Sequence, residues 1–95
     1  MGVRFEWNNK KATSNLNKHK VSFEEAITVF GDPLAVIFDD EIHSEDEVRE
    51  IIIGHSANNR LLLVCFTERE DAIRIISARL ATKVERKDYE ENVHF

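Results

Sequence analysis

Residues 60–79, "RLLLVCFTEREDAIRIISAR", contain two apolar runs separated by a short charged segment. The run "RLLLVCFT" (60–67) is apolar at successive positions, which predicts a central strand covered on both faces. The run "AIRIISAR" (72–79) contains three isoleucines and predicts a second buried strand. Because the connection is short, we expect the two strands to be antiparallel neighbours.

Further strands are predicted on the N-terminal side of this pair. The segment "LAVIFD" (34–39) and the segment "VREIIIGHS" (48–56) have the residue types of strands. The turn "ANN" (57–59) suits a tight hairpin, since asparagine tolerates a positive φ. At the start of the chain, "VRFEW" (3–7) alternates polar and apolar residues and predicts a short strand.

Three helices are predicted around these strands. Residues 8–20 place Ala12, Leu16 and His19 on one helical face, a narrow apolar stripe. Residues 21–30 begin with a capping box of Ser22 and Glu25, and a full apolar stripe follows. The sequence "GDP" (31–33) ends that helix. A second capping box, Thr82 with Glu85, begins a helix that extends to about residue 93.

The predicted element order is therefore β-α-α-β-β-β-β-α. Consecutive strands joined by short turns imply an antiparallel meander with helices packed on it, an α+β fold. A length of 95 residues is sufficient for one domain, residues 1–95, and for no second one.

The charge of the chain is distributed unevenly. The net charge is −5, with +4 on residues 1–20, −9 on residues 21–59 and 0 on residues 60–95. Nucleic acid would be repelled at long range, so any contact with it needs a local basic surface. The acidic region 21–59 suits a basic partner.

Composition also bounds the cellular setting. The sequence contains no apolar run near the roughly 20 residues of a membrane helix, and its N-terminus lacks the apolar stretch of a signal peptide. The single cysteine, Cys65, lies in "LLLVCFT", so we expect a buried free thiol. We therefore expect a cytoplasmic protein with no membrane association.

Metal and cofactor sites are not predicted. The four histidines and Cys65 show neither a C-x-x-C nor an H-E-x-x-H spacing. A glycine-rich phosphate loop is absent from the sequence, which contains only three glycines.

Arginines in the predicted strands are the unusual feature, since a guanidinium is costly to bury without a partner. In a regular strand Arg74 and Arg79 face opposite sides, which would keep them apart unless the strand bends. We expect Arg74 to pair with a carboxylate on a neighbouring element. Arg79, at the strand end, is equally suited to a structural role and to a ligand.

Arginines at other strand ends extend this pattern. Arg49, Arg69 and Arg79 can reach one rim of an antiparallel sheet and would form a cationic cluster suited to a phosphodiester. Arg60, at a hairpin tip, is expected to be a solvated charge.

Two further side chains have both a structural and a chemical interpretation. His19 follows Lys18 at the end of the first helix, where it either covers the core or acts as a general acid or base. His43, in an acidic loop, has the same two interpretations. Tyr89 shares a helical face with Arg86, and it either packs on the sheet or presents its phenol at a site.

The sequence as a whole resembles the BrnT family of bacterial toxins. The specific parts are "KHKVSFEEA" (18–26) and "IRIISAR" (73–79) followed by Ala81, "ER" (85–86) and "YE" (89–90), and the similarity runs from about residue 5 to residue 90. Two departures are Asn8, where the family commonly has aspartate, and Lys20, where it commonly has glycine. Lysine in place of glycine would cost the first helix its easy left-handed cap.

The resemblance implies a RelE-like fold and a metal-independent ribonuclease that inhibits translation. It also implies a DNA-binding antitoxin of the ribbon-helix-helix type (BrnA), so that DNA contact occurs only through the antitoxin. The positions that match the motif are Lys18, His19, Glu47, Arg49, Arg69, Arg74, Arg79, Glu85, Arg86 and Tyr89.

Metal-free RNA cleavage needs a base, a cationic site for the phosphate and an acid. We predict Arg49 and Arg79 as the cationic site, and His19 or Glu47 as base or acid. Side chains predicted to bind RNA are Lys18, Arg69, Arg86 and Tyr89, while Arg74 and Glu85 are predicted to support the site. Two alternatives remain: a non-catalytic interaction protein, and an inactive toxin homologue that acts only in a repressor complex.

Overall fold

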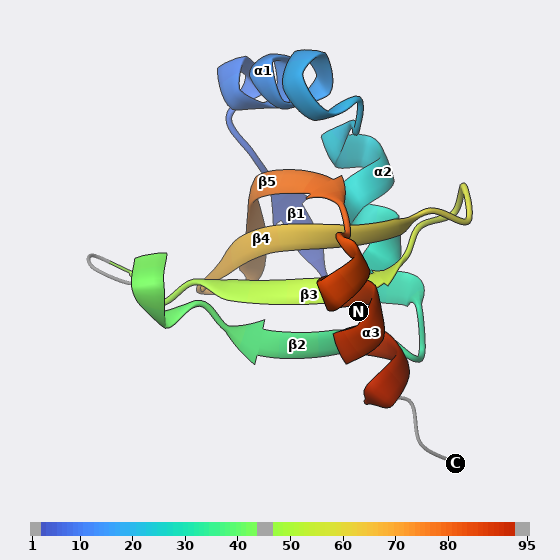
Figure 1. Ribbon diagram of the computed structural model, residues 1–95. Helices are drawn as coiled ribbons and strands as arrows, with labels where there is room; N and C mark the ends of the chain where they lie inside the picture. Colours follow the sequence, from blue (N-terminus) through green and yellow to red (C-terminus); the bar gives the residue numbers. More distant parts are fainter. Residues whose placement is uncertain (1–2, 44–46, 93–95) are drawn as a thin grey trace.

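The computed structural model describes residues 3–43 and 47–92. Its helices and strands, shown in Figure 1, are β1 (Arg4–Glu6), α1 (Asn9–His19), α2 (Phe23–Thr28), the 3₁₀ turn η1 (Val29–Gly31), β2 (Val36–Asp39), the 3₁₀ turn η2 (Glu41–His43), β3 (Glu50–His55), β4 (Leu61–Arg69), β5 (Ala72–Leu80) and α3 (Lys83–Glu91). The predicted element order is confirmed, with the two short 3₁₀ turns in addition. None of the described helices is long and apolar enough to cross a membrane.

The five strands form one mixed sheet in the order β1-β5-β4-β3-β2. Strands β2 to β5 form the predicted antiparallel meander. The purely antiparallel sheet was wrong, however, because β1 pairs with β5 in parallel. Two helices separate β1 from β2, so no tight turn restricts where β1 lies, and it occupies the outer edge of β5. There Phe5 packs against Phe30, with ring centroids 5.1 Å apart and ring planes tilted by 56°.

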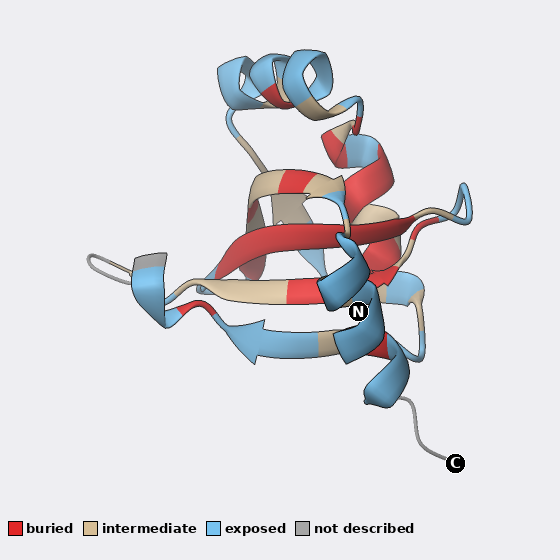
Figure 2. Cartoon of the chain, in the orientation of Figure 1, coloured by how far each residue is buried: buried red, intermediate tan, exposed pale blue. Residues whose placement is uncertain are grey.

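Helices cover both faces of the sheet. Helices α1 and α2 lie on one face, and α3 crosses in front of β3 and β2 on the other (Figure 1). The main core lies under α1 and α2, and a smaller cluster joins Tyr89 of α3 to Ile53, Leu61 and Leu63. Residues 61–67 of β4 are buried throughout, which confirms the predicted central strand (Figure 2).

Strand β5 contains a β-bulge. Ser77 pairs with Cys65 and Ile75 pairs with Phe66, so Ile76 is an extra residue without a partner on β4. A bulge changes which residues share a face of the strand. Ile75 and Ala78 consequently both point into the main core.

The first helix differs from its predicted apolar stripe. Ala12 packs against the main core, but Leu16 is 47% exposed and the buried residue of α1 is Asn15. Asn15 donates from Nδ2 to the carbonyl oxygens of Val21 (2.9 Å) and Ala78 (2.8 Å), and its Oδ1 accepts from the Ala78 amide at 3.1 Å. A polar side chain therefore attaches α1 to β5.

The capping predictions had different outcomes. The Thr82–Glu85 capping box is present. At α2, Ser22 caps the helix, but the Glu25 carboxylate binds Arg60 and Ser56 instead of returning to Ser22. Arg60 was therefore wrongly predicted as a solvated charge. Its hydrogen bond is the main reason that the pKa of the buried Glu25 lies below the usual range.

Candidate functional site

Two adjoining pockets lie on either side of Ile76 and Ser77, which line both of them. The first, about 260 Å³ in volume, is lined by Asp40, Arg49, Ile51, Leu63, Cys65, Ile76, Ser77 and Arg79. The second, about 220 Å³, is lined by Lys11, Ser14, Asn15, Lys18, His19, Ile76 and Ser77. We call the two pockets together the basic groove, because every charged residue that lines them except Asp40 is a lysine, an arginine or the ionisable His19.

The bulge in β5 sets the arrangement of the groove. Three residues of β5 lie opposite alternate residues of β4: the pairs are Arg74 with Thr67, Ser77 with Cys65, and Arg79 with Leu63. Alternate residues of a strand share one face of the sheet, so the three β5 side chains lie on one face as well. The expectation that Arg74 and Arg79 face opposite sides was therefore wrong, because the extra residue reverses the alternation between them.

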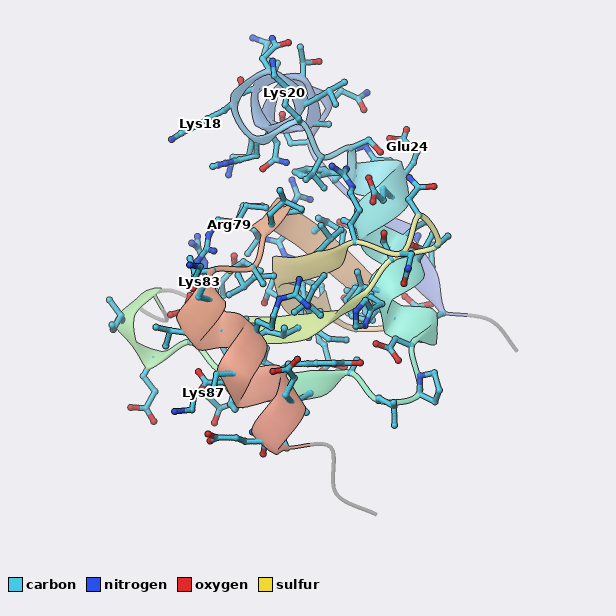
Figure 3. The ribbon with its side chains drawn as sticks, turned by 45° about the vertical axis from the view of Figure 1, so that its right-hand side comes forward. Lys18, Lys20, Glu24, Arg79, Lys83 and Lys87 are labelled. Carbon is cyan, nitrogen blue, oxygen red and sulfur yellow. The ribbon has the colours of Figure 1, made fainter. Side chains whose placement is uncertain are left out.

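Arg79 is held by the first turn of α3. Its Nη1 and Nη2 donate to the two carboxylate oxygens of Glu85 at 2.7 and 2.8 Å. The hydrogen bond from Arg79 is the main cause that lowers the pKa of Glu85, and the same contact raises the pKa of Arg79. Both groups are consequently charged at neutral pH. In Figure 3, Arg79 lies near Lys83, and Lys18 extends from α1 on the same side of the view.

Arg49, the residue immediately before β3, lines the same pocket as Arg79. Its Nε lies 4.0 Å from Oε1 of Glu47, whose Oε2 accepts from Arg69 at 3.0 Å. Glu47 therefore lies between two arginines. Arg69 does not line the groove, so of the three arginines predicted at one rim, Arg49 and Arg79 share a pocket and Arg69 is connected through Glu47.

The last turn of α1 brings Lys18 and His19 to the second pocket. The Asn15 hydrogen bonds to Ala78 fix this turn beside the bulge. Helix α1 ends at His19, and the residue that caps it, Lys20, adopts the left-handed conformation with φ 60°. The groove thus combines a histidine, two lysines and two arginines contributed by α1, β5 and the segment before β3.

A family model described as "Ribonuclease toxin, BrnT, of type II toxin-antitoxin system" matches residues 7–85. The chain belongs to the BrnT family. Its members are ribonuclease toxins whose partner is an antitoxin. No curated protein matches the chain.

The fold is also that of a solved BrnT structure. The ribonuclease toxin BrnT of Brucella abortus superposes with a TM-score of 0.66 and 21% sequence identity. The superposition covers 86% of this chain and 100% of that one. At this identity the similarity establishes the fold.

The remaining positions of the BrnT motif lie outside the groove. Arg74 donates to Glu6 on β1 at 3.0 Å, which confirms its predicted pairing with a carboxylate on a neighbouring strand. Arg86 is exposed on α3 and lines neither pocket. Tyr89 is buried, and both residues lie beyond the span matched by the BrnT model.

The hydroxyl of Tyr89 belongs to a polar cluster between α3 and the sheet. It donates to Oδ2 of Asp32 at 2.9 Å and lies 3.2 Å from Nδ1 of His55. Burial, with Asp32 as a second cause, raises the pKa of Tyr89 to about 12. These contacts make Tyr89 an anchor of α3 on the sheet, and Tyr89 lines neither pocket of the groove.

Cys65 is buried as predicted and its thiol is free. Burial raises its pKa to about 11, with Asp40 adding to the effect. A protonated thiol is a poor nucleophile, so Cys65 contributes packing to the floor of the groove.

Sequence reasoning did not identify Asn15, Ser77 and Lys11 as members of this region. Nothing in the sequence distinguishes Ser77 from other small residues in strands, or Lys11 from other solvent-exposed lysines in helices. A mid-helix asparagine was the one available signal, because asparagine is unfavourable there unless its amide has partners.

Proposed function

We propose that this chain is an endoribonuclease toxin that binds the RNA backbone in the basic groove. One observation carries the proposal: Arg49 and Arg79 line one pocket, and Lys18 and His19 line the pocket that adjoins it across Ser77. Membership of a family of ribonuclease toxins supports the reaction class.

The two arginines are suited to the scissile phosphate. Guanidinium groups match the geometry of phosphate oxygens and remain charged at any physiological pH. Placed on both sides of the phosphate, Arg49 and Arg79 would stabilise the additional negative charge that develops during cleavage. Because Arg79 already shares its donors with Glu85, it would be held in one orientation before RNA binds.

His19 is the proposed proton-transfer residue. As a base, its imidazole takes the proton of the 2′-hydroxyl, whose oxygen attacks the adjacent phosphorus. As an acid, it gives a proton to the departing 5′-oxygen. Glu47 was the other predicted acid or base, but both of its oxygens lie near arginines, so its proposed role is to position Arg49.

Side chains around the groove would extend RNA binding. Lys11 and Lys18 line the second pocket, and Ser77 presents a hydroxyl where the two pockets meet. Arg69 and Arg86 remain proposed contacts for RNA outside the groove, and Tyr89, with its hydroxyl bound to Asp32, is proposed as a structural residue.

Wider properties of the toxin belong to the same proposal. They are a RelE-like fold, metal-independent cleavage that inhibits translation in the cytoplasm, neutralisation by a BrnA-type antitoxin, and DNA contact only through that antitoxin. Their support is the resemblance of the motif residues to BrnT toxins.

The test compares RNA cleavage by the wild-type protein, Arg79→Lys, Arg49→Ala and Arg4→Ala, all in a chelator. Arg4 is an exposed arginine on β1, outside the groove, and serves as the matched control. Cleavage should persist in the chelator, fall roughly 100-fold or more in the two groove variants, and remain unchanged in the control.

Thermal unfolding of each variant separates a lost site from a lost fold. Equal cleavage by all four proteins would refute the groove as the active site. A folded wild-type protein that binds its antitoxin but leaves RNA intact would favour the inactive homologue.

A further inference from the structure

Strand β2 forms an open edge of the sheet. Among the described residues its four positions, Val36–Asp39, pair only with β3, and the pairing is regular. At such an edge, alternate backbone N–H and C=O groups point outward without a strand partner. Proteins commonly protect these edges with charged side chains, especially lysine, with proline, with a bulge or by keeping the strand short. Strand β2 is four residues long and contains one charge, Asp39, but no lysine, proline or bulge.

Large apolar side chains are exposed on both faces of this edge. Ile37 pairs with Ile52 and lies on the face of α1 and α2, whereas Phe38 pairs with Ile51 and lies on the groove face. Ile37 is 54% exposed and Phe38 is 37% exposed. Figure 2 shows most of β2 as exposed, in contrast to the buried β4 two strands away. An added strand would cover both side chains at once.

Three carboxylates on neighbouring strands extend inward from the end of this edge. Asp39 pairs with Glu50 across the two strands, and Glu68 interacts with Glu50 from β4. Burial and these two neighbours raise the pKa of Glu50. Within residues 3–43 and 47–92, these three carboxylates form no ion pair with a lysine, an arginine or a histidine. A cation from a partner would relieve their mutual repulsion.

We propose that the antitoxin adds an extended strand to β2, with alternating apolar residues and a lysine or arginine opposite Asp39. Main-chain hydrogen bonds to the open edge would supply affinity, and the apolar and basic side chains would supply specificity. A second copy of this chain is disfavoured as the occupant, because β2 itself contains neither lysine nor arginine and a second β2 would supply no cation to these carboxylates.

The position of β2 connects this contact with neutralisation. Asp40, the residue after β2, lines the same pocket as Arg49 and Arg79. A partner strand that continued past Asp39 would run next to Asp40 and so come close to this pocket. The proposal rests on the toxin assignment for the existence of an antitoxin, but it does not require that the isolated chain cleave RNA.

The experiment uses the full chain and the antitoxin encoded beside its gene. Affinity is measured for the wild-type protein, for Ile37→Lys, which gives β2 the protection common at natural edges, and for Asp39→Lys. Leu16→Lys, an exposed apolar residue on α1, is the matched control. We expect at least a tenfold loss of affinity in both β2 variants and little change in the control.

Hydrogen exchange is measured on the wild-type protein, so misfolding of a variant cannot affect the result. Backbone amides of β2 should become protected when the antitoxin binds. Unchanged exchange in β2, or equal affinity in all four proteins, would overturn the proposal, as would loss of affinity in Leu16→Lys alone. A wild-type homodimer that Ile37→Lys dissociates, with antitoxin binding intact, would assign the edge to self-association instead.

RNA cleavage is measured separately on the same proteins. Ile37→Lys should cleave RNA as the wild type does but resist neutralisation by the antitoxin. Absence of cleavage in every protein, with the affinity pattern retained, would refute the ribonuclease function and leave the β2 contact standing.

Discussion

Arg79 and Glu85 form a two-hydrogen-bond ion pair that connects the end of β5 to the first turn of α3. Oε1 of Glu85 also accepts from the Thr82 amide at 2.8 Å. One carboxylate therefore caps α3 and orients an arginine of the basic groove, so its ionisation links the stability of the helix to the geometry of the proposed site.

Replacing Glu85 with glutamine should make the protein less stable at neutral pH and less sensitive to acid. The pKa of Glu85 is lowered from 4.5, chiefly by Arg79, so its contribution is present above that pH and is lost as the pH falls below it. Because Arg79 is partly exposed, we expect a destabilisation of about 1 kcal/mol. Urea unfolding at pH 7 and pH 4 measures the difference, with Glu90→Gln as an exposed control on the same helix. An equal loss of stability in both variants would contradict the assigned ion pair.

Replacing His19 with asparagine should lower the turnover of RNA without preventing RNA binding. Loss of one proton-transfer residue typically reduces the rate by about 10²–10⁴-fold. The neighbouring Lys18→Ala should instead raise KM, because it removes a charge that attracts the backbone. Steady-state kinetics of both variants make the comparison, and an unchanged turnover number in His19→Asn would remove His19 from the mechanism.

Replacing Tyr89 with phenylalanine should loosen α3 and leave RNA affinity unchanged. The variant leaves Asp32 without a hydroxyl donor, which we expect to cost roughly 1 kcal/mol measured by urea unfolding.

The chain contains one tyrosine, so the change in absorbance when tyrosinate forms reports the ionisation of Tyr89 alone. Tyr89 should ionise near pH 12 in the folded protein, and stability should fall as the pH rises from 10 towards 12. Ionisation near pH 10 with the fold intact would show that the phenol is exposed. A loss of RNA affinity without loss of stability would restore Tyr89 as an RNA contact.

Replacing Asn15 with leucine should destabilise the protein and reduce activity together. The change removes three hydrogen bonds to the backbone of Val21 and Ala78, and we expect a loss of about 3 kcal/mol. Helix α1 also supplies Lys18 and His19. A shift of this helix should therefore reduce RNA cleavage even in the molecules that remain folded. Asn17→Ala, on the exposed side of α1, is the control and should change neither quantity.

Replacing Lys20 with glycine should stabilise the protein. Lys20 holds a positive φ at the end of α1, a conformation that costs a residue with a Cβ about 1 kcal/mol and costs glycine nothing. Loss of the hydrogen bond from its Nζ to Asn17 reduces the gain to roughly 0.5 kcal/mol. Thermal unfolding measures the effect, and Lys10→Gly within the same helix should destabilise it. A destabilised Lys20→Gly would show that the lysine side chain contributes more than its strain.

The parts of this fold that sequence predicts are those governed by local patterns. The apolar runs and short turns of residues 34–80 predict the meander of β2 to β5, and the Thr82–Glu85 box predicts the start of α3. The parallel partner of β1 was not predictable, because it lies far along the chain and no turn defines it.

The groove was only partly predicted for a related reason. Ile76 looks like an ordinary strand residue, so nothing in "IRIISAR" reveals a bulge that places both arginines on one face. The spacing of Glu25 from Ser22 fits a capping box, and nothing in the sequence indicates that the Glu25 carboxylate binds Arg60 instead. Residue types identified Arg49, Arg79, Lys18 and His19, whereas their arrangement depends on long-range register.

Pairing of β1 with β5 also has a consequence for synthesis of the protein. Residues 4–6 acquire their strand partner only when residues 72–74 have emerged from the ribosome. The groove needs α1 from the beginning of the chain and Arg79 from near its end, so no shorter nascent chain contains both of its walls. Chains that stop before β5 lack Arg79 and one wall of the groove, so we expect them to be unable to form the proposed nuclease site.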